Sequence, residues 1–448
     1  MSEVTNDKVD DVKDQWEKFL DENPSDKFKI IDEEVLSQRI IKELGYVSKM
    51  DVKEYTLYQK WHEIHSKFPT ETVNTVFGEE EKFLKNTVQA RYIEEAKNNI
   101  WIPEHPDSYL DLEPVLEYTD DSVSSTRKDL DGSTIKYDTE RSKELSIKCN
   151  SLKSFITNGR NNSNIGRNLH FVVKDNKTGK YLGVVTISSD FLDLTPRDKY
   201  IGWEREPKTK GGMINHTGIG SSIVPTQPLG FNYVGGKLLS LLCLSDEVQR
   251  LWKQQYGDVL AGVTTTSLYG NTKAGGLSQY DGLDYWSKMG FTSGSVSYEP
   301  EKETIYMIRD WLKAKHTRKY FEWYVATKGS GQPYKRDHKN RSLQFAWAQL
   351  KIPKELTRSD HARGIYFSEL YTNTNEFLRG EIKENQLVKK FDSSYEALVK
   401  IWKEKHARGR IGFLKKKDRV SHDTLFLDDL IYMNWEETRA KYLPQVGR

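Results

Sequence analysis

The segment from residue 169 to residue 189 predicts two strands joined by a tight turn, and it constrains the fold more than any other part of the chain. LHFVVKD at 169–175 and KYLGVVTISS at 180–189 are rich in β-branched and aromatic residues, and NKTG between them has turn chemistry. GSSIVPT at 220–226 predicts a third strand. These segments therefore predict a hairpin and a third strand.

Further segments extend this pattern into an alternating order of helices and strands. Residues 237–257, KLLSLLCLSDEVQRLWKQQYG, have the apolar spacing of one long amphipathic helix that ends at a glycine. Residues 258–270, DVLAGVTTTSLYG, predict a strand, and residues 281–291, DGLDYWSKMGF, predict a short helix with Phe291 opening another strand. We therefore predict the fold class α/β (α+β), with a mixed sheet in which one helix joins two strands.

The two flanks of this core differ from it in composition and charge. We predict an acidic, mainly helical region at 1–140, a core at 141–310 and a basic, aromatic-rich region at 311–448. Residues 1–140 hold 18 Lys or Arg against 33 Asp or Glu, a net charge of −15, whereas residues 311–420 hold 26 against 12, a net charge of +14. Two interpretations stay open: the basic region binds a polyanion while the acidic region binds a protein partner, or the two surfaces dock on each other.

Composition narrows the location and the kinds of site. With 36% hydrophobic and 30% charged residues, the chain has no stretch near the ~20 apolar residues that a membrane span needs. Its acidic beginning has no apolar signal region, and two cysteines, Cys149 and Cys243, form no disulfide framework. We expect a cytoplasmic location and no membrane partner. His62 and His65 are three residues apart, unlike the zinc-binding HExxH helix, so no metal is assigned from spacing.

The junction from residue 224 to residue 237 is a candidate anion site. A strand leads into a glycine-bearing turn and then into the predicted long helix. Glycines let the backbone approach a pyrophosphate, and exposed helix N–H groups favour the anion. The alternative is a glycine-rich connection without a ligand. The candidate residues are Val224, Gln227, Gly230, Gly235, Gly236 and Lys237.

The order of elements and the string YWSKMGF resemble the core of the GNAT acyltransferases. In that superfamily a Q/R-x-x-G-x-G/A turn after the fourth strand holds the pyrophosphate of acyl-CoA. A short helix ending in a Y-x-x-x-G-F-like motif supplies a tyrosine near the CoA sulfur. The resemblance implies a GNAT-like core with acetyl-CoA or a related acyl-CoA as cofactor. Trp286 stands at the usual tyrosine spacing here, and Tyr285 is one residue early.

A narrower resemblance points to DNA. LTPRDKYIGW at 194–203, the strand SSIVPT and RGIYFSELYTNTNEFLRGE at 363–381 resemble the Mom-like family of phage proteins, which modify adenine in DNA and have relatives in the Druantia anti-phage systems. The resemblance implies an enzyme that methylcarbamoylates the adenine amino group with acyl-CoA, in the host cytoplasm if phage-encoded, and iron is implicated in that family. Arg197, Asp198 and Trp203 match the motif. The alternative for Arg197 and Asp198 is a turn-stabilising ion pair.

On this reading the core holds a pocket at strand ends and in the loops beside the thioester. A general base must reach the amine proton at hydrogen-bond distance, which Asp198 or His216 would do, although a histidine in INHTG also fits a simple turn. The expected catalytic residues are Asp198, His216, Ser267, Tyr269 and Tyr285.

The basic region would then bind DNA, and the enzyme would extrude its target base from the duplex. Aromatic residues there either stack on bases or belong to the core: Trp323, Tyr324, Trp347 and Trp402. The expected phosphate contacts are Lys335, Arg336, Lys339, Arg341, Arg363, Lys415, Lys416, Lys417 and Arg419.

Three functions remain open from the sequence. The first is a DNA adenine-modifying acyltransferase. The second is a non-catalytic DNA-binding component of a phage or anti-phage defence system, which Trp286 favours. The third is a protein or small-amine N-acetyltransferase, which the basic region disfavours.

Overall fold

The computed structural model describes most of the chain, and the described part forms two compact units. The described residues are 6–67, 97–119, 126–128, 134–136, 149, 152–153, 156, 166–268, 278–292, 296–326, 336–359, 362–422 and 433–445. The helical unit combines Met1–Tyr55 with Gly294–His361, and the sheet unit combines Thr56–Ser293 with Ala362–Arg448. This division differs from the predicted boundaries near 140 and 310, because in both units segments far apart in sequence pack together.

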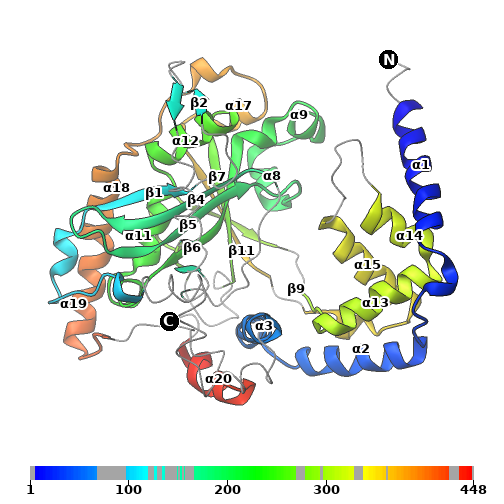
Figure 1. Cartoon of the computed structure of the whole chain (residues 1–448). Helices are drawn as coiled ribbons and strands as arrows, with labels where there is room; N and C mark the ends of the chain where they lie inside the picture. Colours follow the sequence, from blue (N-terminus) through cyan, green and yellow to red (C-terminus); the bar gives the residue numbers. More distant parts are fainter. Residues whose placement is uncertain are drawn as a thin grey trace. The chain divides into compact units, whose positions relative to one another are not determined.

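The sheet unit is built on a seven-stranded mixed sheet (Figure 1), which confirms the predicted α+β class. The strands follow the order β1-β4-β5-β6-β7-β11-β8, and only β6 and β7 are parallel neighbours. Their bounds are β1 Pro114–Thr119, β4 Asn168–Asp175, β5 Tyr181–Ser189, β6 Thr217–Pro225, β7 Gly262–Ser267, β8 Ser287–Phe291 and β11 Gly364–Glu369. A separate two-stranded ribbon joins β2 Thr126–Lys128 to β3 Thr134–Lys136.

The predicted hairpin is confirmed as β4 and β5, which pair antiparallel at the centre of one half of the sheet. Residues 181–188 of β5 are all buried, as expected for a strand covered on both faces. Gly183 has φ +155° and lies so close to β6 that a Cβ would meet the Val224 carbonyl oxygen at 2.4 Å. A larger residue at 183 would force these two strands apart.

Two predictions about helices are wrong. The single helix predicted at 237–257 is two helices, α11 Gly235–Leu242 and α12 Asp246–Tyr256, because the Ser245 side chain accepts a hydrogen bond from the Val248 N–H and starts a new helix there. The short helix predicted at 281–291 is absent. Turns occupy residues 279–285, and β8 follows, so Phe291 ends a strand that pairs with β11.

Helices cover the sheet in layers. α11 packs on β5 and β6, and its leucines 238, 239, 241 and 242 are fully buried. A longer helix lies over α11, formed without interruption by α18 Tyr395–Ile401, the π-helical turn η9 Trp402–Ala407 and α19 Arg408–Lys416. Figure 1 shows it on the left of the sheet unit. The other helices of this unit are η3 Ser108–Asp111, α8 Thr195–Ile201, α9 Arg205–Thr209, η4 Met213–His216, α10 Leu229–Tyr233, α17 Thr374–Leu378, η8 Glu384–Gln386, α20 Trp435–Tyr442 and η11 Leu443–Gln445.

The helical unit joins the acidic N-terminal helices to part of the predicted basic region. Arg39 pairs with Glu303 at 3.0 Å, Thr304 donates to Glu43 at 2.7 Å, and the Trp311 indole N–H donates to Glu33 at 3.0 Å. Its helices are α1 Asn6–Glu22, η1 Ser25–Lys27, α2 Glu33–Val47, α13 Lys302–Lys315, α14 Thr317–Tyr320, the π-helical η7 Phe321–Val325, α15 Arg336–Gln349 and α16 Lys354–Thr357, with a small ribbon of β9 Val296–Ser297 and β10 Arg358–Ser359. α3, Val52–Lys67, includes the point at which the two units divide.

The charges of the two segments of the helical unit balance. Its N-terminal segment, 1–55, has 9 basic and 15 acidic residues, and 294–361 has 14 basic and 8 acidic residues, so the unit is neutral. The ion pairs between the two segments join N-terminal bases to acids of the second segment, Arg39 to Glu303 and Lys29 to Asp310. Among the described residues, no helix combines the length and apolar character needed to cross a membrane.

Candidate functional site

The parallel strands β6 and β7 diverge, and side chains fill the gap. The strands pair only from Thr217 to Ile219 on β6. Beyond that point, the Gly220 carbonyl accepts a hydrogen bond from Thr265 Oγ1 at 3.1 Å and the Ile223 carbonyl accepts one from Gln279 Nε2 at 3.3 Å. The side chains of Thr265 and Gln279 thus replace the missing backbone hydrogen bonds between β6 and β7, and they fill the gap between the two strands.

A buried polar cluster continues from this gap. Gln279 Nε2 also donates to Ser240 Oγ and to the Tyr280 hydroxyl, both at 3.1 Å, and the Tyr366 hydroxyl donates to Asp281 at 2.6 Å. Burial raises the pKa of Tyr280 to about 12, so its hydroxyl stays protonated at neutral pH. The cluster can therefore donate hydrogen bonds, but Tyr280 is no base.

The predicted pyrophosphate residues face protein atoms in this structure. A Cβ on Gly230 would lie 2.6 Å from Gln227 Nε2, one on Gly235 2.8 Å from Leu229 Cγ, and one on Gly236 2.3 Å from Gln279 Oε1. These glycines permit close internal packing, and α10 occupies the expected turn. Half-buried Val224 lies beside them at the end of β6.

Lys237 and the segment after α19 close the junction further. The Lys237 ammonium group donates to the Gln279 carbonyl at 3.1 Å and the Asp281 carbonyl at 2.5 Å, and burial lowers its pKa. The fully buried Asn232 amide donates to the Ser421 carbonyl and accepts from its N–H. The residues present therefore do not fit the pyrophosphate of acyl-CoA, since they offer neither an open cradle nor an available lysine.

Arg197 and Asp198 belong to a buried ion network. Fully buried Arg197 pairs with Asp190 and with Asp198, each at 2.7 Å, and Lys208 pairs with Asp198 at 2.9 Å. Thr264 donates to Asp190 at 2.6 Å. Burial alone would raise the pKa of Asp198, but the Lys208 hydrogen bond and the Arg197 charge lower it below its ordinary value. Arg197 and Asp198 therefore form the ion pair that the sequence analysis gave as the alternative to a catalytic role. Because the Asp198 carboxylate is already bound by Arg197 and Lys208, it is a weak base.

The rest of the RDKYIGW string ends α8 and anchors it. Gly202, with φ +76°, closes α8 by donating its N–H to the Asp198 carbonyl at 3.0 Å. The Trp203 indole N–H donates to the Leu378 carbonyl at 2.6 Å, and the Arg197 guanidinium lies 5.1 Å from the Trp203 ring centroid. The string therefore connects α8 to α17, which contains Leu378.

Among the described residues, no hydrogen bond or ion pair joins Asp198 to His216, Ser267 or Tyr285. His216 lies at the start of β6, where Nδ1 is 2.9 Å from the Val259 carbonyl and Nε2 is 3.7 Å from Asp258. The 224–237 junction begins near the other end of that strand, eight residues or about 26 Å away. Ser267 ends β7, Tyr285 stacks on Phe391, and Tyr269 lies outside the described residues.

The expected DNA contacts divide between the two units. Lys335 lies outside the described residues; Arg336 and Lys339 belong to α15 of the helical unit, and Arg341 is exposed there. Arg363 precedes β11 and is half-buried. In contrast, Lys415, Lys416, Lys417 and Arg419 are all exposed at the end of α19.

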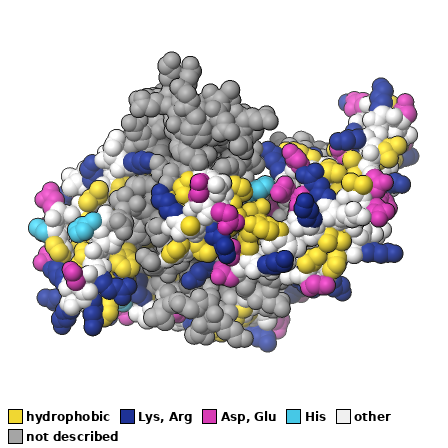
Figure 2. Space-filling model, turned by 90° about the horizontal axis from the view of Figure 1, so that it is seen from below, with side chains coloured by type: hydrophobic (Ala, Val, Ile, Leu, Met, Phe, Trp, Pro, Cys, Tyr) yellow, Lys and Arg dark blue, Asp and Glu magenta, His cyan; other side chains and the backbone are white. Residues whose placement is uncertain are grey.

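The helix α18–η9–α19 has one buried side and one basic side. Leu398, Trp402, Ile411 and Leu414 face the core, and the Trp402 indole N–H donates to the Tyr233 carbonyl at 2.8 Å. Trp402 is therefore core and not a base-stacking residue. Residues 395–419 hold nine Lys or Arg against three Asp or Glu. Figure 2 shows dark-blue side chains gathered at its lower left, on the side where Figure 1 places α19.

Four of the nine cations already have partners. Lys405 pairs with Asp284 at 2.9 Å and Lys415 with Asp107 at 3.1 Å, while Lys403 and Arg410 donate to backbone carbonyls. The other five are exposed and have no side-chain partner within the described part of the chain. We name them the basic helix surface: Lys400, Arg408, Lys416, Lys417 and Arg419.

Aromatic residues in the helical unit pack against one another. The Trp323 ring meets Phe345 edge-on at 5.6 Å, and the Tyr324 hydroxyl lies 2.5 Å from Ser342 Oγ. Trp323, Tyr324 and Trp347 are all half-buried. These contacts favour the core interpretation of Trp323 and Tyr324 over base stacking.

Sequence reasoning missed Lys400 and Arg408 on the helix, and Gln279 and Tyr280 in the sheet gap. The spacing of Leu398, Trp402, Ile411 and Leu414 was an available signal, because it fixes which helix side is buried and leaves both basic residues exposed. No local signal marks Gln279, whose partners lie far away in the sequence. The described residues contain no group of three His, Cys, Asp or Glu able to hold a metal ion.

Comparisons with known proteins agree on one family. The family model described as Druantia protein DruA matches residues 157–380, half of the chain. The Druantia protein DruA of Escherichia coli (strain UMEA 4076-1) is 24% identical over 229 residues, covering 48% of this chain and 54% of that protein, so the chain spans about half the length of this curated relative. The family match ends before α18. No solved structure matches.

Proposed function

Because this chain belongs to the Druantia protein DruA family, we propose that it acts in anti-phage defence as a nucleic-acid-binding protein, with the basic helix surface as its contact. The observation that carries the proposal is the set of five exposed cations, on the α18–η9–α19 helix and the three residues after it, that have no acidic partner among the described residues. A cation paired with a carboxylate must break that pair to bind a phosphate, whereas these five need only release water and counterions.

DNA is the proposed ligand because closely spaced cations on a rigid helix match a chain of phosphates. The α19 end offers three of the five within four residues, 416–419, and Arg408 lies about two turns earlier. Phosphate contacts of this kind bind with little sequence preference. Base recognition, if the chain has any, would come from other residues.

We predict the salt dependence of this binding from the number of contacts. Five phosphate contacts give a slope of about −4.5 for log affinity against log salt on duplex DNA, a loss of roughly 500-fold between 50 and 200 mM, and about −3.5 on a single strand. Fluorescence anisotropy of the full chain with a labelled 20-mer measures both slopes. Absence of binding at 50 mM salt would remove the proposal, and a slope near zero would assign binding to other contacts.

A second candidate is the acyl-CoA-dependent modification of the adenine amino group, by analogy with the Mom-like resemblance. One observation favours it: β6 and β7 are parallel, joined by a helical crossover, and diverge at their carboxyl ends, where ligands of open α/β sheets commonly bind. The closed junction around Gly236 and Lys237 argues against CoA binding in this conformation. Acyl-CoA therefore remains a prediction, as does any iron.

Two measurements test this candidate. Calorimetry with acetyl-CoA is expected to detect binding only if the side chains of Gln279 and Lys237 move out of the junction. If the candidate is right, Gln279→Ala should strengthen acetyl-CoA binding, because it removes one of these side chains. Mass spectrometry of nucleosides from co-expressed DNA would detect a new adenosine species. If the two measurements detect no CoA binding and no modified adenosine, this candidate is excluded. The proposal of nucleic-acid binding is not affected by that result.

A further inference from the structure

Two aromatic rings next to the basic helix surface are stacked in an unusual way. Tyr285 and Phe391 lie face to face, with ring centroids 3.7 Å apart and planes only 9° from parallel. Isolated aromatic pairs prefer offset or edge-on arrangements over such a sandwich. Both rings are partly exposed and pack with their other edges against the core. The surrounding fold therefore holds the pair in a geometry that the rings alone would not choose.

The backbone of Tyr285 is strained in the same place. Its φ is +70°, in the left-handed region that a large side chain rarely adopts. Residues held in such conformations cluster at binding and catalytic sites, where the surrounding structure maintains them. The Tyr285 hydroxyl has no hydrogen-bond partner among the residues that the structure describes. The strained backbone therefore positions the Tyr285 ring, but the Tyr285 hydroxyl makes no hydrogen bond in the described part of the chain that would explain this conformation.

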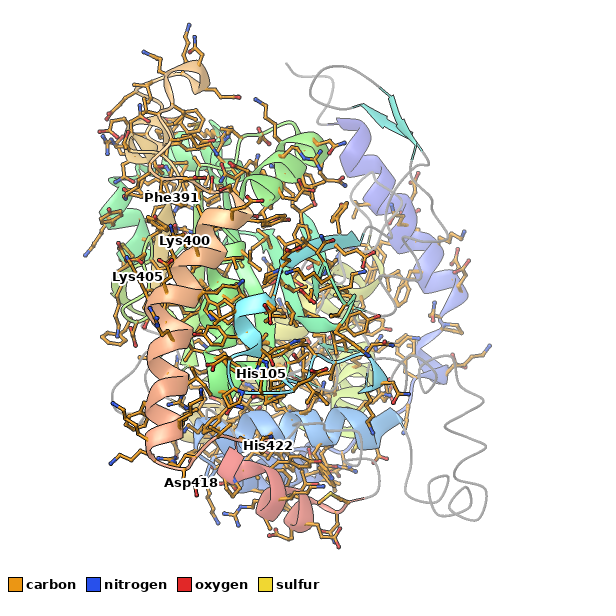
Figure 3. The ribbon with its side chains drawn as sticks, turned by 90° about the vertical axis from the view of Figure 1, so that its left-hand side faces the viewer. His105, Phe391, Lys400, Lys405, Asp418 and His422 are labelled. Carbon is orange, nitrogen blue, oxygen red and sulfur yellow. The ribbon has the colours of Figure 1, made fainter. Side chains whose placement is uncertain are left out.

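Cations of the helix lie beside this pair. Asp284, which precedes Tyr285, pairs with Lys405 at 2.9 Å, and Phe391 precedes α18, which contains Lys400. Figure 3 shows Phe391 at the upper end of the helix, with Lys400 and Lys405 following along it. The π-helical turn η9 begins between these two lysines, and π turns are frequent at functional sites. Stacked aromatic rings near an exposed cation such as Lys400 are features that proteins combine to bind single-stranded nucleic acids.

We propose that the Tyr285–Phe391 pair is a stacking platform for an unpaired base, so that the preferred ligand of the basic helix surface is single-stranded nucleic acid. The inference rests on the proposed function and narrows its ligand class. A base in a closed duplex has no free face, whereas an unpaired base can extend the existing two-ring stack as a third member. The phosphates on either side of that base then continue toward Lys400 and down the helix.

The test compares single-stranded and duplex oligonucleotides of equal length, each labelled for anisotropy, with the full-length protein at 50 mM salt. Wild type is expected to bind the single strand more tightly and to quench a 2-aminopurine base placed in it. Phe391→Leu is expected to weaken single-strand binding roughly 5- to 150-fold, the usual range for one stacked base, and to leave duplex binding unchanged. Phe391→Tyr keeps a ring and should restore binding.

Tyr200→Leu is the matched control, because Tyr200 is an exposed tyrosine on α8. Unchanged single-strand binding by Phe391→Leu, or no quenching by wild type, would overturn the platform while leaving the basic helix surface intact. Binding of neither oligonucleotide by wild type would instead contradict the proposed function. If Phe391→Leu fails to fold, the wild-type quenching and the Phe391→Tyr affinity decide alone.

Discussion

Reversing three charges, Lys416→Glu, Lys417→Glu and Arg419→Glu, is expected to weaken DNA binding on the order of 100-fold at 0.1 M salt. All three side chains are exposed and have no acidic partner in the described part of the chain, so their loss disturbs no internal contact. Removing three phosphate contacts should also reduce the salt slope by about three. Anisotropy titrations at several salt concentrations measure both effects.

A matched control separates this local effect from the change in net charge. Lys199, Arg205 and Lys210 are equally exposed, lie on or beside α8 and α9, and give the same charge change when replaced by glutamate. This control is expected to retain most of the affinity. Equal losses in the two triple variants would show that only the overall charge matters, and the basic helix surface would lose its special role.

Replacing Arg197 by Met is expected to lower the free energy of unfolding of the sheet unit by about 3–5 kcal/mol. The Arg197 guanidinium is the shared partner of Asp190 and Asp198, and Asp190 is fully buried as well. Without it, two carboxylates remain in a poorly solvated site, with Lys208 beside only one of them. Urea denaturation followed by tryptophan fluorescence measures the change.

Arg250→Met serves as the control for the Arg197 substitution. Arg250 pairs with Glu247 at 2.8 Å on the exposed side of α12, where an ion pair contributes at most about 1 kcal/mol. A loss at Arg197 as small as that at Arg250 would contradict the assignment of a buried network. Nearly full DNA binding by folded Arg197→Met would agree with its structural role.

Local patterns predicted the elements whose partners are neighbours in sequence. β4 and β5 follow from their β-branched and aromatic residues and from the turn between them, all within about 20 residues. β8 was wrongly predicted as a helix. Its partner strand, β11, is more than 70 residues away, and the residues SKMGF contain no local pattern that indicates a strand. The break at Ser245 was hidden by apolar spacing that continues across it, although serine followed by two acidic residues is a usual start for a helix.

The glycines of the 224–237 junction illustrate a second limit. A sequence shows where a side chain is missing but not what occupies the space. From the sequence, Gly235 and Gly236 fit a phosphate-binding loop as well as they fit a closely packed connection. The structure shows close packing, with Leu229 against Gly235 and Gln279 against Gly236. The charge segregation has the same ambiguity, because a net charge shows how many charged residues a segment holds but not which of them pair.

Lysine footprinting tests the central claim, the location of nucleic acid on the basic helix surface, most directly. The full-length protein is acetylated with and without saturating single-stranded DNA at 50 mM salt, and each lysine is quantified by mass spectrometry. Bound DNA is expected to protect Lys400, Lys416 and Lys417, which are exposed without the ligand, and to leave the labelling of Lys199 and Lys210 unchanged. Unchanged labelling of all three helix lysines in the presence of bound DNA would contradict it.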